Sequence, residues 1–476
     1  MLFNSFAYVI FLPIVFAAYW LIKDEYRWVL LLVSSYFFYM CSGPKYGLLI
    51  LSVTFVSYVA AIVIEKYQNK KKLALVSAIL VCMGILFFFK YFNFFSKTIS
   101  ELMSLLGIKE DYVTLNIILP VGISFYTFQT MSYVIDVYKG ITKAEHHFGK
   151  FAAFVSFFPQ LVAGPIERSN NLLPQIKEKH IFDYDKAMMG VKLMLWGYYK
   201  KLVIADGLAE YVQRVFDNPH EYTGFALIIA SLFFTLQIYC DFSGYSDIAI
   251  GTAKLFGIDL MTNFKSPYFS ESIREFWSRW HISLSTWFRD YVYIPLGGNR
   301  VSRVRHYVNL MITFLVSGLW HGADWTFVTW GGIHGLAQVA EDVVIGKEKT
   351  KNAFLRVIRS VLVFGFCSFA WIFFVSHSIS DAFYVISHCL YGIGNPIVYL
   401  NGGLANLRIG KSMLAVFGTF IFIMAAYDYI SLKKDFIEWI SSKNKIIQRG
   451  FYLLVGLIVV FFSKKGVAAE FIYFQF

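Results

Sequence analysis

Charged residues are scarce in this sequence. Asp, Glu, Lys and Arg make up 16% of its 476 residues, whereas 57% are hydrophobic and 19% are aromatic. A soluble domain averages about a quarter charged residues and about 45–50% apolar ones. The composition, with a mean hydropathy of +0.56, excludes an ordinary soluble domain and predicts an integral membrane protein.

Cysteine is also sparse, and its spacing carries no pairing pattern. The chain has five cysteines and no CxxC pair; they stand at Cys41, Cys82, Cys240, Cys367 and Cys389. An odd number of scattered cysteines indicates neither a disulfide framework nor a zinc site. We therefore expect no metal ion.

Familiar motifs of soluble enzymes are missing as well. The sequence has no GxSxG elbow and no HExxH pair. The stretch "GGLANLRIGKS" has Ala405 where a phosphate-binding loop needs its first glycine, and "GIGNP" continues into Ile397. A phosphate loop and a dinucleotide fingerprint are thus excluded, and no bound cofactor is expected.

The basic residues are not gathered into a stripe. The net charge is +12, but lysines and arginines stand in short loops between apolar runs. This pattern reflects membrane topology and contact with anionic lipids. Membrane lipids are therefore predicted partners, and nucleic acid is not.

Long apolar runs are what the sequence does have. About 20 residues are needed to cross roughly 30 Å of hydrocarbon. Two runs, 150–164 and 242–257, are interrupted by Gly, Pro or acidic residues and are expected to be re-entrant or half-buried. Twelve runs approach the required length: 5–22, 28–41, 47–64, 73–90, 117–135, 187–204, 223–240, 306–320, 324–344, 355–376, 412–430 and 450–463. The predicted fold is all-α, a polytopic membrane protein with about 11–12 transmembrane helices.

The basic loops predict how the chain is oriented. If the N-terminus is outside, the inside segments hold 30 of the 43 Lys and Arg residues and the outside segments hold about nine. The positive-inside rule then places both termini outside. The polar insertion 258–305 interleaves aromatic residues with arginines, so we expect cytoplasmic interfacial helices there. We interpret 1–476 as a single membrane-embedded domain.

Polar groups stand out inside the apolar runs. The stretch "QIYCDFSGYSDIAIG" carries Asp241 near the end of a predicted span, and "RWHISLSTWFRDY" carries His281. Polar side chains at membrane depth either join helices to one another or line a site. For Asp241, helix capping or pairing with an interfacial arginine is an equally good explanation.

Two histidines lie in the very apolar stretch "SGLWHGADWTFVTWGGIHG". On one continuous helix His321 and His334 would be about 140° and roughly 20 Å apart, so they could not act on the same atom. His321 stands beside Gly322, where two predicted spans break. We predict His321 as the catalytic candidate and His334 as an interhelical hydrogen-bond donor.

These clusters resemble a known family. Their order is similar to that of membrane-bound O-acyltransferases, and in particular to the bacterial alginate O-acetyltransferase branch. Asp324 departs from the Asn or Ser expected at its position. The matching stretches are "LPVGISFYTFQTMSYVIDVY", "FFPQLVAGPIER", "QIYCDFSGYSDIAIG", "FWSRWHISLSTWFRDYVYIPLGG", "GLWHGADWTFVTWGGIHG" and "FIYFQF".

The resemblance implies a site and a reaction. The histidine of the "WHG" motif corresponds to His321, implied to be catalytic, and His281 corresponds to a supporting histidine. The candidates for substrate binding are Trp320, Asp241, Tyr245, Arg289 and Asp324. We expect an acyl group, first of all acetyl, to pass from a cytoplasmic thioester to a hydroxyl outside a bacterial cytoplasmic membrane.

Several alternatives stay open at this point. The donor is either acetyl-CoA or an acyl carrier protein. The acceptor is a polysaccharide, reached directly or through an extracytoplasmic acetyltransferase or esterase-like partner. D-alanyl transfer to teichoic acid is a second reaction of the same kind. A transporter or flippase of lipid-linked sugars is the competing class, although we find no internal repeat of the kind transporters often show.

Overall fold

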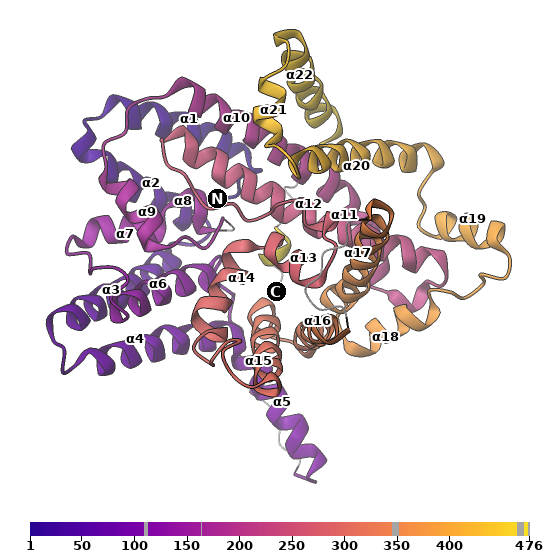
Figure 1. The fold of residues 1–476 in the computed structure, drawn as a ribbon, viewed down its shortest axis with the longest axis horizontal. Helices are drawn as coiled ribbons and strands as arrows, with labels where there is room; N and C mark the ends of the chain where they lie inside the picture. Colours follow the sequence, from indigo (N-terminus) through magenta and orange to yellow (C-terminus); the bar gives the residue numbers. More distant parts are fainter. Residues whose placement is uncertain (109–112, 163, 345–351, 464–470, 475–476) are drawn as a thin grey trace. The chain divides into compact units, whose positions relative to one another are not determined.

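The computed structural model describes residues 1–108, 113–162, 164–344, 352–463 and 471–474, and these residues form helices and loops without any strand (Figure 1). They divide into two compact units. Unit 1 comprises 1–191 and 249–261, and unit 2 comprises 192–248 and 262–476. The expected single domain stays a prediction.

Unit 1 is a set of helices that pack through aromatic side chains. Within it α3, α4 and α6 lie side by side (Figure 1). Phe158 packs against Phe11, Phe38 and Phe256 in its core. Its elements are α1 (Phe6–Leu21), η1 (Asp24–Tyr26), α2 (Arg27–Met40), α3 (Pro44–Lys66), α4 (Lys71–Leu86), η2 (Phe87–Tyr91), α5 (Phe92–Leu105), α6 (Ile123–Tyr138), α7 (Phe148–Ser156), α8 (Phe158–Leu161), α9 (Ser169–Lys177) and most of α10 (Tyr184–Tyr198).

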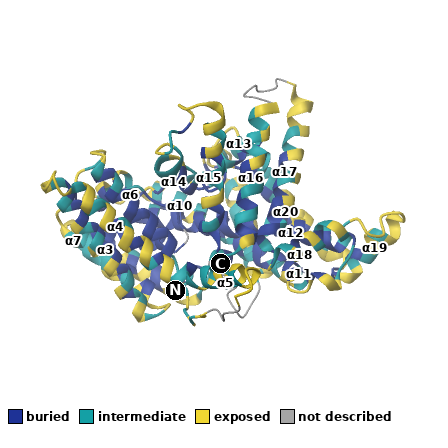
Figure 2. Cartoon of the chain, turned by 90° about the horizontal axis from the view of Figure 1, so that it is seen from below, coloured by how far each residue is buried: buried dark blue, intermediate teal, exposed yellow. Residues whose placement is uncertain are grey.

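Unit 2 holds the histidines of interest. Most residues of α12 are buried, whereas most residues of α19 are exposed (Figure 2). The last part of α12 belongs to unit 1. The elements are η3 (Tyr199–Ala205), α11 (Asp206–Phe216), η4 (Pro219–Glu221), α12 (Phe225–Leu255), η5 (Pro267–Phe269), α13 (Ile273–Arg279), α14 (Ile282–Phe288), η6 (Arg289–Tyr293), α15 (Arg303–His321), α16 (Trp325–Val344), α17 (Ala353–Val375), α18 (Ile379–His388), α19 (Pro396–Asn406), α20 (Lys411–Ser431), α21 (Phe436–Ser441), α22 (Lys445–Phe462) and η7 (Ile472–Phe474).

Six helices of the described chain are long and apolar enough to cross a membrane. The prediction of an all-α, polytopic membrane protein is thereby confirmed, although fewer helices meet this criterion than the twelve expected. Several expected spans form helices of only 14 to 16 residues, as in α1, α2 and α6. The six are Pro44–Lys66, Lys71–Leu105, Phe225–Leu255, Ala353–Val375, Lys411–Ser431 and Lys445–Phe462.

The segment 242–257, expected to be an interrupted, re-entrant or half-buried piece, does not stand apart. Most of it continues the preceding run in the single 31-residue helix α12. Its glycines do not break it because they serve close packing: a Cβ on Gly244 would lie 2.7 Å from the carbonyl oxygen of Gly197 in α10. Small residues at a crossing let two helix backbones approach.

A tight hairpin of two helices carries His321 and His334. α15 and α16 lie side by side (Figure 1) and touch through their backbones. A Cβ on Gly318 would lie 2.3 Å from the carbonyl oxygen of Phe327, and one on Gly331 would lie 2.3 Å from that of Phe314. Neither position has room for a side chain.

The insertion 258–305 contains the short helices that its pattern predicts. α13 begins at the capping residue Ser272, whose hydroxyl accepts a hydrogen bond from the Glu275 backbone N–H at 3.0 Å. α14 and η6 follow directly. The cytoplasmic position of these helices stays a prediction.

Candidate functional site

His321 is the last residue of α15 and is 2% exposed. Its Nδ1 lies 2.6 Å from the carbonyl oxygen of Ser317, one turn earlier. A carbonyl can only accept a hydrogen bond, so Nδ1 carries the proton in the neutral ring. The lone pair is then on Nε2, the nitrogen that can take up a proton.

The break that was predicted beside Gly322 is present. α15 ends at His321 and α16 begins at Trp325, so the 20 Å separation of a continuous helix does not apply. Instead both His321 and His334 pack on the Trp330 ring, with centroid distances of 4.8 and 5.1 Å.

His334 joins two helices, but its predicted role as donor is wrong. Its Nδ1 lies 3.2 Å from the indole nitrogen of Trp277 in α13. An indole N–H can only donate, so His334 accepts this bond. The residue stabilises the packing of α16 on α13.

His281 occupies a strained position immediately before α14. Its φ is 44°, in the left-handed region that residues other than glycine rarely adopt. Its Nδ1 lies 3.3 Å from the side-chain oxygen of Asn263, which also accepts bonds from the Ser283 backbone N–H and hydroxyl. Asn263 therefore fixes the orientation of a completely buried imidazole.

Burial lowers the pKa of His281 well below its usual value of 6.5, and repulsion from His321 lowers it further. The unfolded chain thus binds more protons than the folded chain as the pH falls below about 6.5, so acid destabilises the fold. Above pH 6.5 the imidazole is mostly neutral in both the folded and the unfolded chain, so His281 does not destabilise the fold there.

We expect the melting temperature in detergent to fall less steeply between pH 7.5 and 5.5 in His281→Asn than in the wild type. Asparagine is chosen because it tolerates a positive φ. For the free energy of unfolding, the slopes of the two proteins can differ by at most about 1.4 kcal/mol per pH unit, which corresponds to one proton. Identical slopes in the two proteins would contradict the buried, neutral imidazole.

Trp320 and Tyr473 bring aromatic rings against both histidines. Trp320 lies 5.0 Å from His321 and 6.1 Å from His281, between ring centroids. Tyr473 lies 5.8 Å from His321 and 6.4 Å from His281. The predicted pair His321 and His281 is thus brought into one buried cluster.

The 471–473 segment is held against α12. Phe471 packs on Tyr245 at 4.8 Å, and Tyr473 packs on Phe242 at 4.6 Å. Phe242 in turn contacts His281, also at 4.6 Å. Tyr245, a predicted substrate-binding residue, is buried by this packing.

Asp241 is the second predicted binding residue that the structure places beside this segment. One carboxylate oxygen lies 2.7 Å from the Lys201 ammonium, and the other accepts a hydrogen bond of 2.8 Å from the Ile472 backbone N–H. Lys201 also lies 2.9 Å from Asp206. The pairing alternative considered for Asp241 is realised with a lysine, not an arginine.

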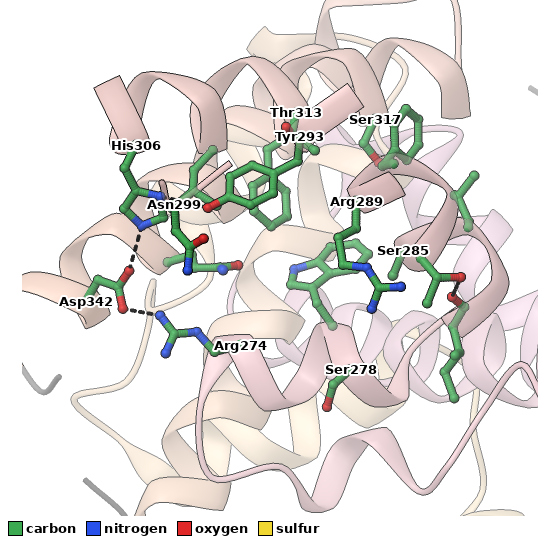
Figure 3. A pocket seen from close by; sticks show the side chains of 18 residues that line it. Arg274, Ser278, Ser285, Arg289, Tyr293, Asn299, His306, Thr313, Ser317 and Asp342 are labelled. Atoms are coloured by element: carbon green, nitrogen blue, oxygen red, sulfur yellow. Dashed lines mark hydrogen bonds and ion pairs between the residues drawn. The ribbon is translucent and has the colours of Figure 1, made fainter. Parts of the chain in front are cut away.

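A large cavity of about 640 Å³ (Figure 3) is lined in part by α15, the helix that ends at His321. One face of α15 lines it at helical spacing, through His306, Leu310, Thr313 and Ser317. Ser317 is the residue whose carbonyl holds His321. The cavity thus ends one helical turn from the imidazole.

Basic side chains stand in the wall of the large cavity. Arg274 pairs with Asp342, which also lies 3.3 Å from His306 (Figure 3). Arg289, a predicted binding residue, lines the cavity, is 58% exposed at its side chain and contacts Asp290 at 2.8 Å. Arginines suit an anionic ligand better than lysines because the guanidinium can bind two oxygens at once.

A small cavity of about 290 Å³ lies beyond the end of α15. Asp324, the remaining predicted binding residue, lines it and also caps α16 by accepting a 2.9 Å hydrogen bond from the Thr326 N–H. Ile472 and Phe374 lie in its wall, and Phe374 contacts His321 at 5.8 Å. His321 therefore contacts one lining residue of each cavity, Ser317 of the large one and Phe374 of the small one.

Comparisons with known proteins identify the family of the chain. The profile of the membrane-bound O-acyltransferase family matches residues 143–380, which include His281 and His321. The chain belongs to this family. As a membrane-bound O-acyltransferase it is an enzyme that transfers an acyl group to an oxygen atom.

Its relatives carry several acceptor names. It is 38% identical over 421 residues to the probable alginate O-acetylase AlgI of Pseudomonas aeruginosa, covering 87% of this chain and 80% of that protein. It is 32% identical to the peptidoglycan O-acetyltransferase of Helicobacter pylori, covering 100% and 98%. The teichoic acid D-alanyltransferase of Streptococcus thermophilus is 31% identical over 48% of this chain and 59% of that protein.

Sequence reasoning did not single out Asn263, Lys201 or Tyr473 of this O-acyltransferase. The "YYKK" stretch inside the predicted span 187–204 was a usable signal, because a lysine in hydrocarbon requires a partner. Tyr473 was visible only as part of the "FIYFQF" resemblance. Nothing local marks Asn263.

Proposed function

We propose that this O-acyltransferase moves an acetyl group from a thioester in the large cavity to a hydroxyl that enters through the small cavity, with His321 as the general base. The observation that carries the proposal is that His321 contacts a residue in the wall of each cavity. Relatives named O-acetylases cover most of the chain, whereas the D-alanyltransferases match only about half of it. Acetyl transfer is therefore favoured over D-alanyl transfer.

The chemistry follows from the tautomer of His321. Nε2 takes the proton of the attacking hydroxyl while the hydroxyl oxygen bonds to the thioester carbonyl carbon. The carbon–sulfur bond then breaks, and His321 returns the proton to the leaving thiolate. A neutral imidazole in a dry site suits this task, since its ordinary pKa is close to working pH.

His281 supports this step by its position. The bond of its Nδ1 to Asn263 leaves the lone pair on Nε2, so the neutral ring cannot donate to the thioester carbonyl. The one proton of the attacking hydroxyl goes to His321, so we propose that His281, held by Asn263, packs against the Tyr473 ring and orients it. A role in polarising the thioester would need a charged ring that burial opposes.

Tyr473 is the first hydroxyl that we propose to be acylated. Its ring contacts both histidines, and its OH has no hydrogen-bond partner among the described residues. In this route an ester forms on the Tyr473 oxygen as the thiol leaves. The acceptor oxygen then attacks that ester, and the phenolate recovers a proton from His321.

Tyr473→Phe is therefore expected to lower acetyl transfer at least 100-fold with little loss of stability. Mass spectrometry of the wild type, incubated with donor but without acceptor, should find an acetyl group on Tyr473. Tyr199→Phe, which removes another buried hydroxyl bonded to the Phe420 carbonyl at 2.8 Å, should keep most activity. Undiminished transfer by Tyr473→Phe would show direct transfer to the acceptor.

The donor is proposed to enter from the cytoplasmic side, where 258–305 concentrates seven Lys and Arg residues. Arg274 and Arg289 line the large cavity and are placed to meet the phosphates of an anionic carrier. Arg279 and Arg300 are not among the described residues that line it. Acetyl-CoA is the first donor to test and an acetylated carrier protein is the second.

The acceptor is proposed to be an uncharged hydroxyl group outside the membrane, on a polysaccharide or on a partner protein. The small cavity combines Gln213 and Gln237 with two carboxylates, Asp217 and Asp324, and no Lys or Arg is among its described lining residues. Like charges disfavour a carboxylate-bearing sugar there. Amides and aromatic rings suit a neutral sugar.

Transfer of labelled acetyl groups in sealed vesicles tests the proposal. We expect label from acetyl-CoA, supplied on the side of the 258–305 loop, to reach amino-sugar oligomers at the other face faster than polyuronate oligomers. Label that appears only with an acetylated carrier protein would correct the donor. Export of sugars without consumption of thioester would overturn the proposal.

A further inference from the structure

A buried ionic cluster adjoins the proposed site. It consists of Lys201, Asp206 and Asp241, each less than 10% exposed. Charged groups at such depth are costly unless they are paired. The question is what this cluster contributes beyond pairing.

We propose that Asp241 is a positioning residue that fixes the 471–473 segment in the site. Its second carboxylate oxygen accepts the Ile472 backbone N–H at 2.8 Å, which is the residue just before Tyr473. Phe242 and Tyr245, on the same stretch of α12, pack on Tyr473 and Phe471. One short stretch of α12 therefore holds the backbone and two rings of the segment.

Lys201 supplies the opposite charge for the Asp241 carboxylate, at 2.7 Å from one of its oxygens. A hydrogen bond to a charged acceptor is about twice as strong as one between neutral groups. Asp206, at 2.9 Å from the ammonium, holds Lys201 in place.

The local fold explains how a lysine reaches Asp241. α10 and α12 cross at Gly197 and Gly244, where each glycine faces the carbonyl oxygen of the other. Two residues after Gly197, α10 continues as the π-helix η3, which contains Lys200 and Lys201. Lys200 pairs with Asp247 at 2.6 Å, so the two neighbouring lysines serve different carboxylates on α12.

The proposal rests on the proposed function only for the role of Tyr473. If Asp241 positions the segment, its loss should lower the turnover number for transfer while the KM for the thioester stays unchanged, because the large cavity lies elsewhere. A measurement that does not depend on activity separates the positioning role of Asp241 from the proposed function. Tyr473→Cys supplies one: the rate at which a maleimide labels the introduced thiol reports release of the segment.

The decisive pair of variants is Ile472→Pro and Ile472→Ala in the Tyr473→Cys background. Proline removes the N–H and is tolerated at the first position of a helical turn, where Ile472 stands in η7. Alanine keeps the N–H. We expect labelling to be about tenfold faster in the proline variant than in the alanine variant.

Asp241 variants complete the test. Asp241→Ala should speed labelling as much as Ile472→Pro, the double variant should add little, and Asp241→Asn should have a smaller effect because its amide oxygen can still accept. Asp247→Ala, which breaks the neighbouring ion pair, is the control and should leave labelling unchanged. The same substitutions in chains that keep Tyr473 correct for labelling of the five native cysteines.

Two results would overturn the proposal. One is equal labelling of the proline and alanine variants at position 472, which stays informative even if Asp241→Ala fails to fold. The other is equal acceleration by Asp241→Ala and Asp247→Ala, which would mark both as pairs that only stabilise the fold. Faster labelling in a chain that shows no acetyl transfer would support the positioning role and count against the proposed function alone.

Discussion

His321→Ala is expected to lower acyl transfer by about 10²- to 10⁴-fold, the usual contribution of a general base. The substitution removes Nε2, the atom proposed to take up the hydroxyl proton. The initial rate of label transfer, in vesicles with matched expression, measures the loss. The melting temperature should fall as well, because alanine leaves a cavity where the buried ring packs on Trp330, so the rate is compared in protein that is still folded at the assay temperature.

His334→Gln is the matched control. It changes a second buried histidine that packs on the same Trp330 ring, and the glutamine oxygen can still accept the Trp277 bond. Transfer should stay within about threefold of the wild type, because His334 is not the general base of the proposed reaction. If His321→Ala kept comparable activity, His321 would be a structural residue and the base would lie elsewhere.

Gly331→Ala is expected to damage both stability and transfer. The new Cβ would lie 2.3 Å from the Phe314 carbonyl oxygen and 3.1 Å from Gly318 Cα, and backbone atoms cannot rotate away. Such overpacking costs about 1–3 kcal/mol. Moving α16 by about 1 Å would displace Trp330 from His321, and a misplacement of that size can cost about 100-fold in rate.

The adjacent glycine gives the control for this prediction. A Cβ on Gly332 would meet only the Leu315 side chain, at 3.5 Å, which is ordinary contact. Gly332→Ala should therefore be neutral or stabilising by up to about 1 kcal/mol, the gain in helix propensity. Thermal denaturation in detergent and the transfer rate, measured for both variants, test the pair. Equal effects of the two substitutions would show that the backbone contact is unimportant.

The sequence was most informative where local chemistry decides. Apolar runs predicted a helical membrane protein, and Gly322 marked the end of α15. The number of spans was harder to predict. Hydropathy does not show whether a moderately polar helix of sufficient length packs its polar side chains against other helices. α15 and α16, with 19 and 20 residues, show this difficulty.

The partners of the site residues could not be predicted for a different reason. Asn263 reaches His281 across 18 positions and Ile472 reaches Asp241 across 231. Such contacts depend on how helices cross, which single-residue preferences do not encode. The positive φ of His281 is likewise imposed by its surroundings, since no local signal calls for it.

The place of His321 in its helix has an electrostatic consequence. The peptide dipoles of α15 add up to a partial negative charge at the end of the helix where His321 stands. When the imidazole takes up a proton during transfer it becomes a cation, and this end of the helix attracts it. The attraction is worth about 0.3–2 kcal/mol, so the 19-residue helix that delivers the base also stabilises the charge it acquires.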